Sequence, residues 1–188
     1  MQPATGGGQD AFVSRVNATL TSRLQSTHFG GSGNDVAYAV AIHPTSGDVY
    51  IAGSTTSTDL PGTRGAAQAA SSGLVAAFVV RFNAALTSRL QTTYLGGGAL
   101  DIAYAMAIHP TTGEVYVTGD TQSFNWASHV RGAAQSKFGG FPFLDRNGPF
   151  PRADCFVSRF NAKALSKNNS NWNNWWIFIT TTVRLKAE

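Results

Sequence analysis

Charge and cysteine are both scarce in this sequence of 188 residues. Charged residues make up 13% of it, and Cys155 is its one cysteine. A single cysteine excludes an internal disulfide framework and a cysteine-based zinc site. We expect Cys155 to pack as a small apolar residue within the strand pattern "DCFVSRF" rather than to act as a catalytic thiol. The net charge of +4 comes from scattered arginines, and the lack of a basic stripe argues against nucleic-acid binding.

Long apolar runs and familiar catalytic signatures are missing as well. No stretch is long and apolar enough to predict a membrane-spanning helix, and the start "MQPATGGGQD" lacks the basic and apolar regions of a signal peptide. The sequence has no Gly-x-Ser-x-Gly elbow, His-Glu-x-x-His motif, phosphate loop or dinucleotide-binding fingerprint. It does have 20 glycines and abundant Thr, Ser and Ala, which is typical of an all-β, turn-rich protein.

An internal repeat organises the chain. The stretch 35–57, "DVAYAVAIHPTSGDVYIAGSTTS", returns at 101–123 as "DIAYAMAIHPTTGEVYVTGDTQS", an offset of 66 residues. Fifteen of the 23 positions are identical, so we expect both copies to fold and pack in the same way.

The first half of each copy alternates alanines with bulky residues. In the first copy these are Ala37, Ala39 and Ala41 against Tyr38, Val40 and Ile42. A period of two predicts a strand. Because neither side is polar, we expect it to be buried on both faces, with the small face receiving the bulky face of the equivalent strand in the next unit. After a Pro/Gly turn, a second strand is expected over 49–52 in the first copy and 115–118 in the second, each ending at a glycine.

Hairpins flank the repeat. The stretch 11–31 recurs at 77–97, again offset by 66, and a third hairpin begins at Asp154. A complete period therefore holds four strands, 36–42, 49–52, 78–82 and 86–95, and four antiparallel strands make one propeller blade. The predicted fold is all-β: about two and a half β-propeller blades, as an open arc or a ring closed by self-association. Three equivalent arginines, Arg15, Arg81 and Arg159, are expected at a solvated edge or in ion pairs.

The predicted organisation has three parts. Residues 1–9 form a flexible N-terminus, 10–165 the repeat domain (half blade 10–31, blade 32–97, blade 98–165) and 166–188 an atypical Asn/Trp-rich segment. The second long loop carries an aromatic insertion that contains Phe138, Phe141 and Phe143. Such a loop is expected either to bind a ligand through these rings or to fold them onto its own blade.

The repeat resembles the SBBP family of bacterial β-propeller repeats, over most of residues 10–161. The residues that carry the resemblance are Gly30, Gly31, Gly33, Asp35, Ala41, Gly47, Val49, Tyr50, Gly53, Thr55 and Ser57, then Ala77, Phe78, Val79, Arg81 and Asn83. The resemblance implies a propeller in a secreted or surface bacterial protein. It implies no defined activity.

Two pairs of repeated polar residues are candidates for chemistry. His43 and His109 end equivalent strands, where we expect each to close its own turn, with metal ligation as the alternative. Asp35 and Asp101 begin the inner strands, near one mouth of a propeller's channel, where with Asn34 they would suit calcium. The alternative is that each carboxylate accepts backbone N–H groups of the adjacent glycine-rich turn.

Two functions follow from these features. The first is a binding module that contacts a protein, a glycan or a small molecule through its loops. The second is a calcium-dependent hydrolase of a lactone or ester, with Asp35, Asp101, His43 or His109 as base. Closed propellers need about four to eight blades, so we also expect a homo-oligomer or a part of a longer propeller.

Overall fold

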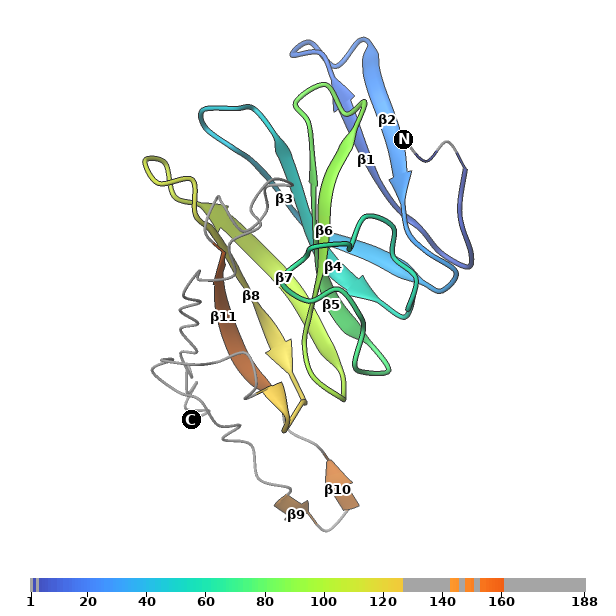
Figure 1. Cartoon of the computed structure of the whole chain (residues 1–188), viewed down its shortest axis with the longest axis vertical. Helices are drawn as coiled ribbons and strands as arrows, with labels where there is room; N and C mark the ends of the chain where they lie inside the picture. The colour runs from blue at the N-terminus through green and yellow to red at the C-terminus, as the bar shows by residue number, and fades with distance from the viewer. Residues whose placement is uncertain (1, 3, 127–142, 146–147, 151–152, 161–188) are drawn as a thin grey trace.

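The computed structural model describes residues 2, 4–126, 143–145, 148–150 and 153–160, and every named element in these ranges is a β-strand. The all-β prediction is therefore confirmed (Figure 1). The strands are β1 (Ala11–Val16), β2 (Arg23–Phe29), β3 (Asp35–Ile42), β4 (Val49–Thr55), β5 (Ala76–Phe82), β6 (Arg89–Leu95), β7 (Asp101–Ile108), β8 (Val115–Thr121), β9 (Phe143–Asp145), β10 (Gly148–Phe150) and β11 (Asp154–Phe160). Within these residues no helix is long and apolar enough to cross a bilayer.

The strands form three main antiparallel sheets, which we name by their order in the chain. The first sheet is the hairpin β1–β2, the central sheet has the order β3-β4-β5-β6, and the third sheet has the order β7-β8-β11. β9 and β10 make a separate small hairpin. Each of these sheets is open, and none closes on itself, in the part of the chain that the structure describes.

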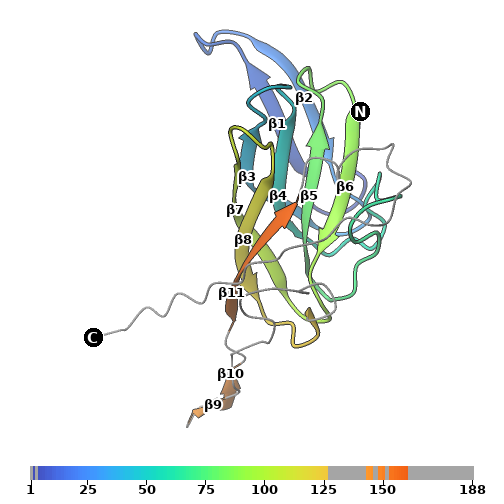
Figure 2. The ribbon, with the colours of Figure 1, turned by 60° about the vertical axis from the view of Figure 1, so that its left-hand side comes forward.

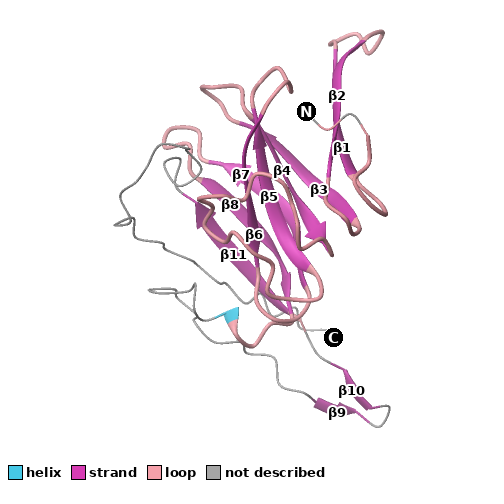
Figure 3. Ribbon diagram, turned by 45° about the vertical axis from the view of Figure 1, so that its right-hand side comes forward, coloured by secondary structure: helices cyan, strands magenta, loops and turns pink. Residues whose placement is uncertain are grey.

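The repeat is reproduced in the strand pairing. Asp35 lies opposite Thr55 in the central sheet, and Asp101 lies opposite Thr121 in the third sheet. Figure 2 shows that the equivalent inner strands β3 and β7 also lie side by side, and β7 contacts β4 as well. Figure 3 shows the first sheet on the other side of the central sheet, so the three sheets are stacked in chain order.

Two apolar layers hold the stack together. One lies between the first and central sheets, where Phe29 packs against Phe78 and Phe82 with ring centroids 5.2 and 6.1 Å apart. The other lies between the central and third sheets and joins Tyr50 and Val79 to Val117 and other buried side chains. Each layer therefore joins one face of a sheet to the opposite face of its neighbour.

A β-bulge changes the predicted facing of the inner strands. The pairing of β3 with β4 shifts between Ala37 and Ala39, and Tyr38 is the extra residue. The shift puts Ala37 against the first apolar layer and Ala39 against the second, so the three alanines do not share one face. The expectation of burial on both faces is also wrong, because Tyr38, Val40 and Ile42 are exposed.

The predicted strand ends need one further correction. Strands β4 and β8 do not stop at Gly53 and Gly119 but continue through them to Thr55 and Thr121. The glycines are needed because the backbones approach closely beside the bulge: a Cβ atom at either position would lie 1.8 Å from the carbonyl oxygen of Val36 or Ile102. The predicted tail, 166–188, lies outside the described residues.

Candidate functional site

The two predicted calcium aspartates begin β3 and β7 and are fully buried. Each carboxylate accepts three hydrogen bonds, two from hydroxyls at or just after the end of the paired strand and one from the glycine turn that precedes it. In the third sheet, Asp101 accepts them from Thr121 Oγ1 at 2.5 Å and from Ser123 Oγ and Gly97 N at 2.8 Å. In the central sheet, Asp35 accepts the same three bonds from Thr55, Ser57 and Gly31. The predicted bond from the glycine-rich turn is therefore present in both copies.

The surroundings of these carboxylates favour a structural role. Burial raises the pKa of the Asp101 carboxyl, and the bonds from Thr121, Ser123 and Gly97 oppose that rise. Asn34 is exposed, and its Oδ1 accepts a bond from Gln9 N at 2.9 Å. No group of three or more His, Cys, Asp or Glu side chains that could hold a metal ion occurs among the residues described.

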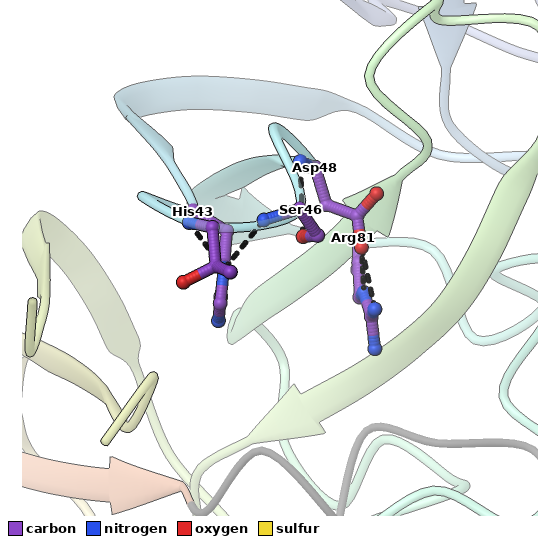
Figure 4. Close-up of polar contacts among 5 residues, drawn as sticks. His43, Ser46, Asp48 and Arg81 are labelled. Carbon is purple, nitrogen blue, oxygen red and sulfur yellow. Dashed lines mark hydrogen bonds and ion pairs between the residues drawn. The ribbon is translucent and has the colours of Figure 1, made fainter. Parts of the chain in front are cut away.

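The repeated histidines close the turns that follow them, as predicted. His43 Nδ1 accepts bonds from the backbone N of Thr45 and Ser46, both at 3.3 Å (Figure 4). His109 Nδ1 makes the same two contacts, at 3.3 and 3.1 Å. With Nδ1 accepting, the neutral ring carries its proton on Nε2. His43 Nε2 faces the turn of the next repeat, where a Cβ atom on Gly113 would lie 2.5 Å away.

An ion pair lies beside the first histidine turn. Arg81 Nε and Nη2 donate to Asp48 Oδ2 at 2.8 and 2.5 Å (Figure 4), and the guanidinium lies 5.8 Å from the Tyr50 ring centroid. The third sheet has a looser counterpart between Arg159 and Glu114, at 3.8 Å. Of the two predicted settings, a solvated edge or an ion pair, these two arginines have the ion pair.

Cys155 is exposed, so its predicted packing as a small core residue is wrong. Its side chain lies on the opposite face of β11 from the buried Phe156, and Sγ is 3.8 Å from Asp120 Oδ1. Partial burial of the sulfur and the neighbouring Asp120 carboxylate raise the pKa of the thiol, which disfavours the reactive thiolate.

The proposed aromatic ligand site cannot be placed. Phe138 and Phe141 lie outside the described residues, and Phe143 is described only as the first backbone position of β9.

An uncovered surface with several apolar side chains lies on the first sheet. We call it the front face: Phe12, Ser14 and Val16 of β1 with their neighbours Leu24, Ser26 and His28 of β2. These residues, except Val16, line a hollow of about 550 Å³ that also includes Gln2 and Arg23. The opposite side of the same sheet carries Val13 and Phe29 and packs on the central sheet.

The central sheet shows what the front face would look like when covered. Phe12 and Val16 are 69% and 46% exposed, whereas their counterparts Phe78 and Phe82 are 0% and 2% exposed. The difference arises because the first sheet covers Phe78 and Phe82, and no described residue covers Phe12 and Val16 in the same way. Exposed apolar area of this kind marks an interaction surface more often than a catalytic one.

Leu20, in the loop between β1 and β2, is uncovered as well. It has a left-handed backbone with φ of 58° and is 78% exposed, whereas Leu86, with φ of 56°, is 1% exposed. A leucine in this conformation costs about 1–2 kcal/mol, which full burial offsets at Leu86. Leu20 has the same conformational cost, but no comparable burial offsets it.

The sequence motifs do not point to the front face, because its residues are ordinary strand residues. The available signal was the number of strands, since the chain supplies a hairpin before its first complete four-stranded sheet. No family model matches this sequence, and no curated protein matches it either, so the candidate surface is defined by geometry alone.

Proposed function

We propose that this chain is a binding module made of β-propeller blades, belongs to a secreted or surface-exposed bacterial protein, and binds proteins through its uncovered blade faces. The sequence resemblance to SBBP repeats supports the propeller and the location. The stacking of equivalent strands supports the blades.

One observation carries the proposal: apolar side chains at equivalent positions are buried in the central sheet and exposed in the first. Phe78 and Phe82 show that this face packs on another sheet when one is present, and Phe12 and Val16 present it to solvent. Burial of the two side chains would contribute roughly 1.5–3 kcal/mol each. The surface is therefore suited to contact with an apolar protein face.

The repeated polar residues support binding over catalysis. Asp35 and Asp101 accept bonds from the glycine turns that precede them, and the Nδ1 atoms of His43 and His109 accept bonds from the turns that follow them. A hydrolase needs a base that can reach a substrate. These side chains are instead committed to holding the strand ends and turns.

The test compares self-association of three proteins by light scattering over a range of concentrations. The wild type should associate at micromolar concentration and bind a hydrophobe-reporting dye. The double variant Phe12→Ser/Val16→Ser should stay monomeric and bind less dye. Leu74→Ser is the matched control, because Leu74 is 85% exposed in a loop and should not alter association.

A monomeric wild type that binds no dye would contradict the proposal. Calcium titration followed by a panel of lactones and aryl esters examines the hydrolase hypothesis. Calcium-dependent turnover that Asp35→Asn abolishes would replace the binding module with a hydrolase. We expect neither calcium binding nor turnover of these substrates, together with association through Phe12 and Val16.

A further inference from the structure

We propose that the molecule has a docking site for a two-stranded β-hairpin, formed by the free edge of β1 and by Val40 and Ile42 of β3. The partner is an inner hairpin of the same repeat type, supplied in trans, with a sequence like residues 101–121. This inference rests on the proposed binding function and names a partner for it.

The first argument is the pairing of equivalent strands. β5 pairs with β4 on one side and β6 on the other, and β11 pairs with β8. β1 has nearly the same sequence as β11, "AFVSRV" against "CFVSRF", but within the described residues it pairs with β2 alone. Its free edge is therefore the one that β4 occupies beside β5 and that β8 occupies beside β11.

The second argument is the exposure of β3. Val40 lies opposite Ile51, and Ile42 lies opposite Val49, so both point to the face that meets the first sheet. They are 62% and 66% exposed, because the first sheet consists of two strands and does not extend over them.

The third argument is the same position one repeat later. Met106 and Ile108, the counterparts of Val40 and Ile42, pack against the apolar layer that contains Tyr50 and Ala52 of β4. Ala39 of β3 packs against that layer too. The β3–β4 hairpin thus covers these positions of the third sheet. It contributes the small side chain of Ala39 from β3, and Tyr50 and Ala52 from β4.

These three arguments define the occupant. Its second strand would pair antiparallel with β1, as β4 pairs with β5, and its first strand would lay alanines over Val40 and Ile42. A single extended peptide would pair with the free edge of β1 but would leave Val40 and Ile42 of β3 uncovered. A hairpin would pair with the edge and cover both side chains.

The probe is a labelled synthetic peptide of residues 98–123, which spans β7 and β8, and binding to the full chain is followed by fluorescence anisotropy. We expect saturable binding, with new protection from hydrogen exchange in β1 and β3. The variant Val40→Ser/Ile42→Ser should bind at least about tenfold more weakly, since each lost apolar contact is worth roughly 1.5–3 kcal/mol. Leu74→Ser and a scrambled peptide are the controls.

A second experiment supplies the hairpin in cis, as a fusion protein. A copy of residues 32–75, which contain β3, β4 and their following loop, replaces residues 1–9 and is joined directly to Asp10, the counterpart of Ala76. The tether raises the effective concentration, so the melting temperature should rise above that of the same fusion carrying Ala39→Asp and Ala41→Asp in the added copy. The proposal is overturned if the peptide does not bind and the fusion gains no stability over its control.

The two proposals fail separately. A wild type that stays monomeric but binds the peptide would contradict the front face as an association surface and would support the hairpin site. Self-association that requires Phe12 and Val16, with no peptide binding and no gain in the fusion, would support the module and remove this site.

Discussion

Gly53 shows how one missing side chain sets the geometry of the repeat. The backbone of β4 passes so close to Val36 that only hydrogen fits on the Cα atom of residue 53, and the same holds at Gly119. The close passage accompanies the bulge at Tyr38, which turns Ala37 and Ala39 to opposite faces. The glycine therefore allows one strand to serve two apolar layers.

Gly53→Ala should lower the free energy of unfolding by roughly 1–3 kcal/mol or more, because the new methyl group overlaps a backbone oxygen that cannot move without breaking the pairing. Chemical denaturation measures the change. Gly65→Ala is the control for the steric effect: nothing lies within 4 Å of its added Cβ, and its φ of 73°, a conformation that Gly53 does not share, costs an alanine only about 1–2 kcal/mol of backbone strain. A loss at Gly53 smaller than the loss at Gly65 would mean that the close passage at Val36 is absent in solution.

Asp101 should give stability an acid-dependent component. Burial raises its pKa in the folded state, so the folded protein binds the proton more tightly than the unfolded chain does. The resulting stabilisation is complete below the unfolded value, about 3.8, and is lost as pH rises through the folded pKa. The wild type should therefore lose stability relative to Asp101→Asn as pH rises from the acid range. A difference that is constant with pH would contradict this.

At the scale of the element, the β1–β2 and β5–β6 hairpins are built alike but are placed differently. Asn17 and Asn83 accept the same pair of backbone bonds across their loops, and Leu20 and Leu86 share a left-handed backbone. The loops thus match in conformation while one leucine is exposed and the other buried.

This contrast gives a paired prediction. Leu20→Asn should raise the free energy of unfolding by up to about 1 kcal/mol, because asparagine tolerates the left-handed conformation and little burial is lost. Leu86→Asn should lower it by roughly 2–5 kcal/mol, because it empties a filled core position. Urea unfolding at low protein concentration measures both. A comparable loss in the two variants would show that Leu20 is covered in the folded monomer.

The hairpins and the four-strand order of the central sheet were predictable from the sequence because each follows from local alternation and from the offset of 66 residues. The bonds to Asp35 and His43 were predictable for the same reason, since their partners lie in adjacent turns. The bulge at Tyr38 was not, because an alternating pattern looks regular even where one residue is left unpaired. The exposure of Cys155 was not predictable either, because strand alternation alone does not say which face is covered.

At the scale of the whole molecule, the stack of sheets depends on small residues where equivalent inner strands meet. Ala39 packs between the central and third sheets, and the rings of Tyr38 and Tyr104 lie 5.5 Å apart at the same edge. The spacing between β3 and β7 is therefore set by alanine on one side and larger residues on the other.

Ala39→Leu should lower the free energy of unfolding by roughly 1–3 kcal/mol, since the added volume has to separate the two sheets. Ala105→Leu is the matched control, because Ala105 is the equivalent residue of the third sheet and is exposed. Thermal unfolding followed by circular dichroism distinguishes them. An unchanged melting temperature for Ala39→Leu would contradict the packing of Ala39 between the sheets.

The pairing of β4 with β5 and of β8 with β11 has a consequence for engineering. Thr55 lies opposite Ala76, and Thr121 lies opposite Asp154, in the same register, although the connection 56–75 is shorter than the connection 122–153. Strand pairing here is thus independent of how much chain joins the strands. A foreign peptide spliced in beside Gly65, where nothing lies within 4 Å of an added Cβ, should be displayed without disturbing the sheets, which makes this repeat a usable carrier for grafted loops.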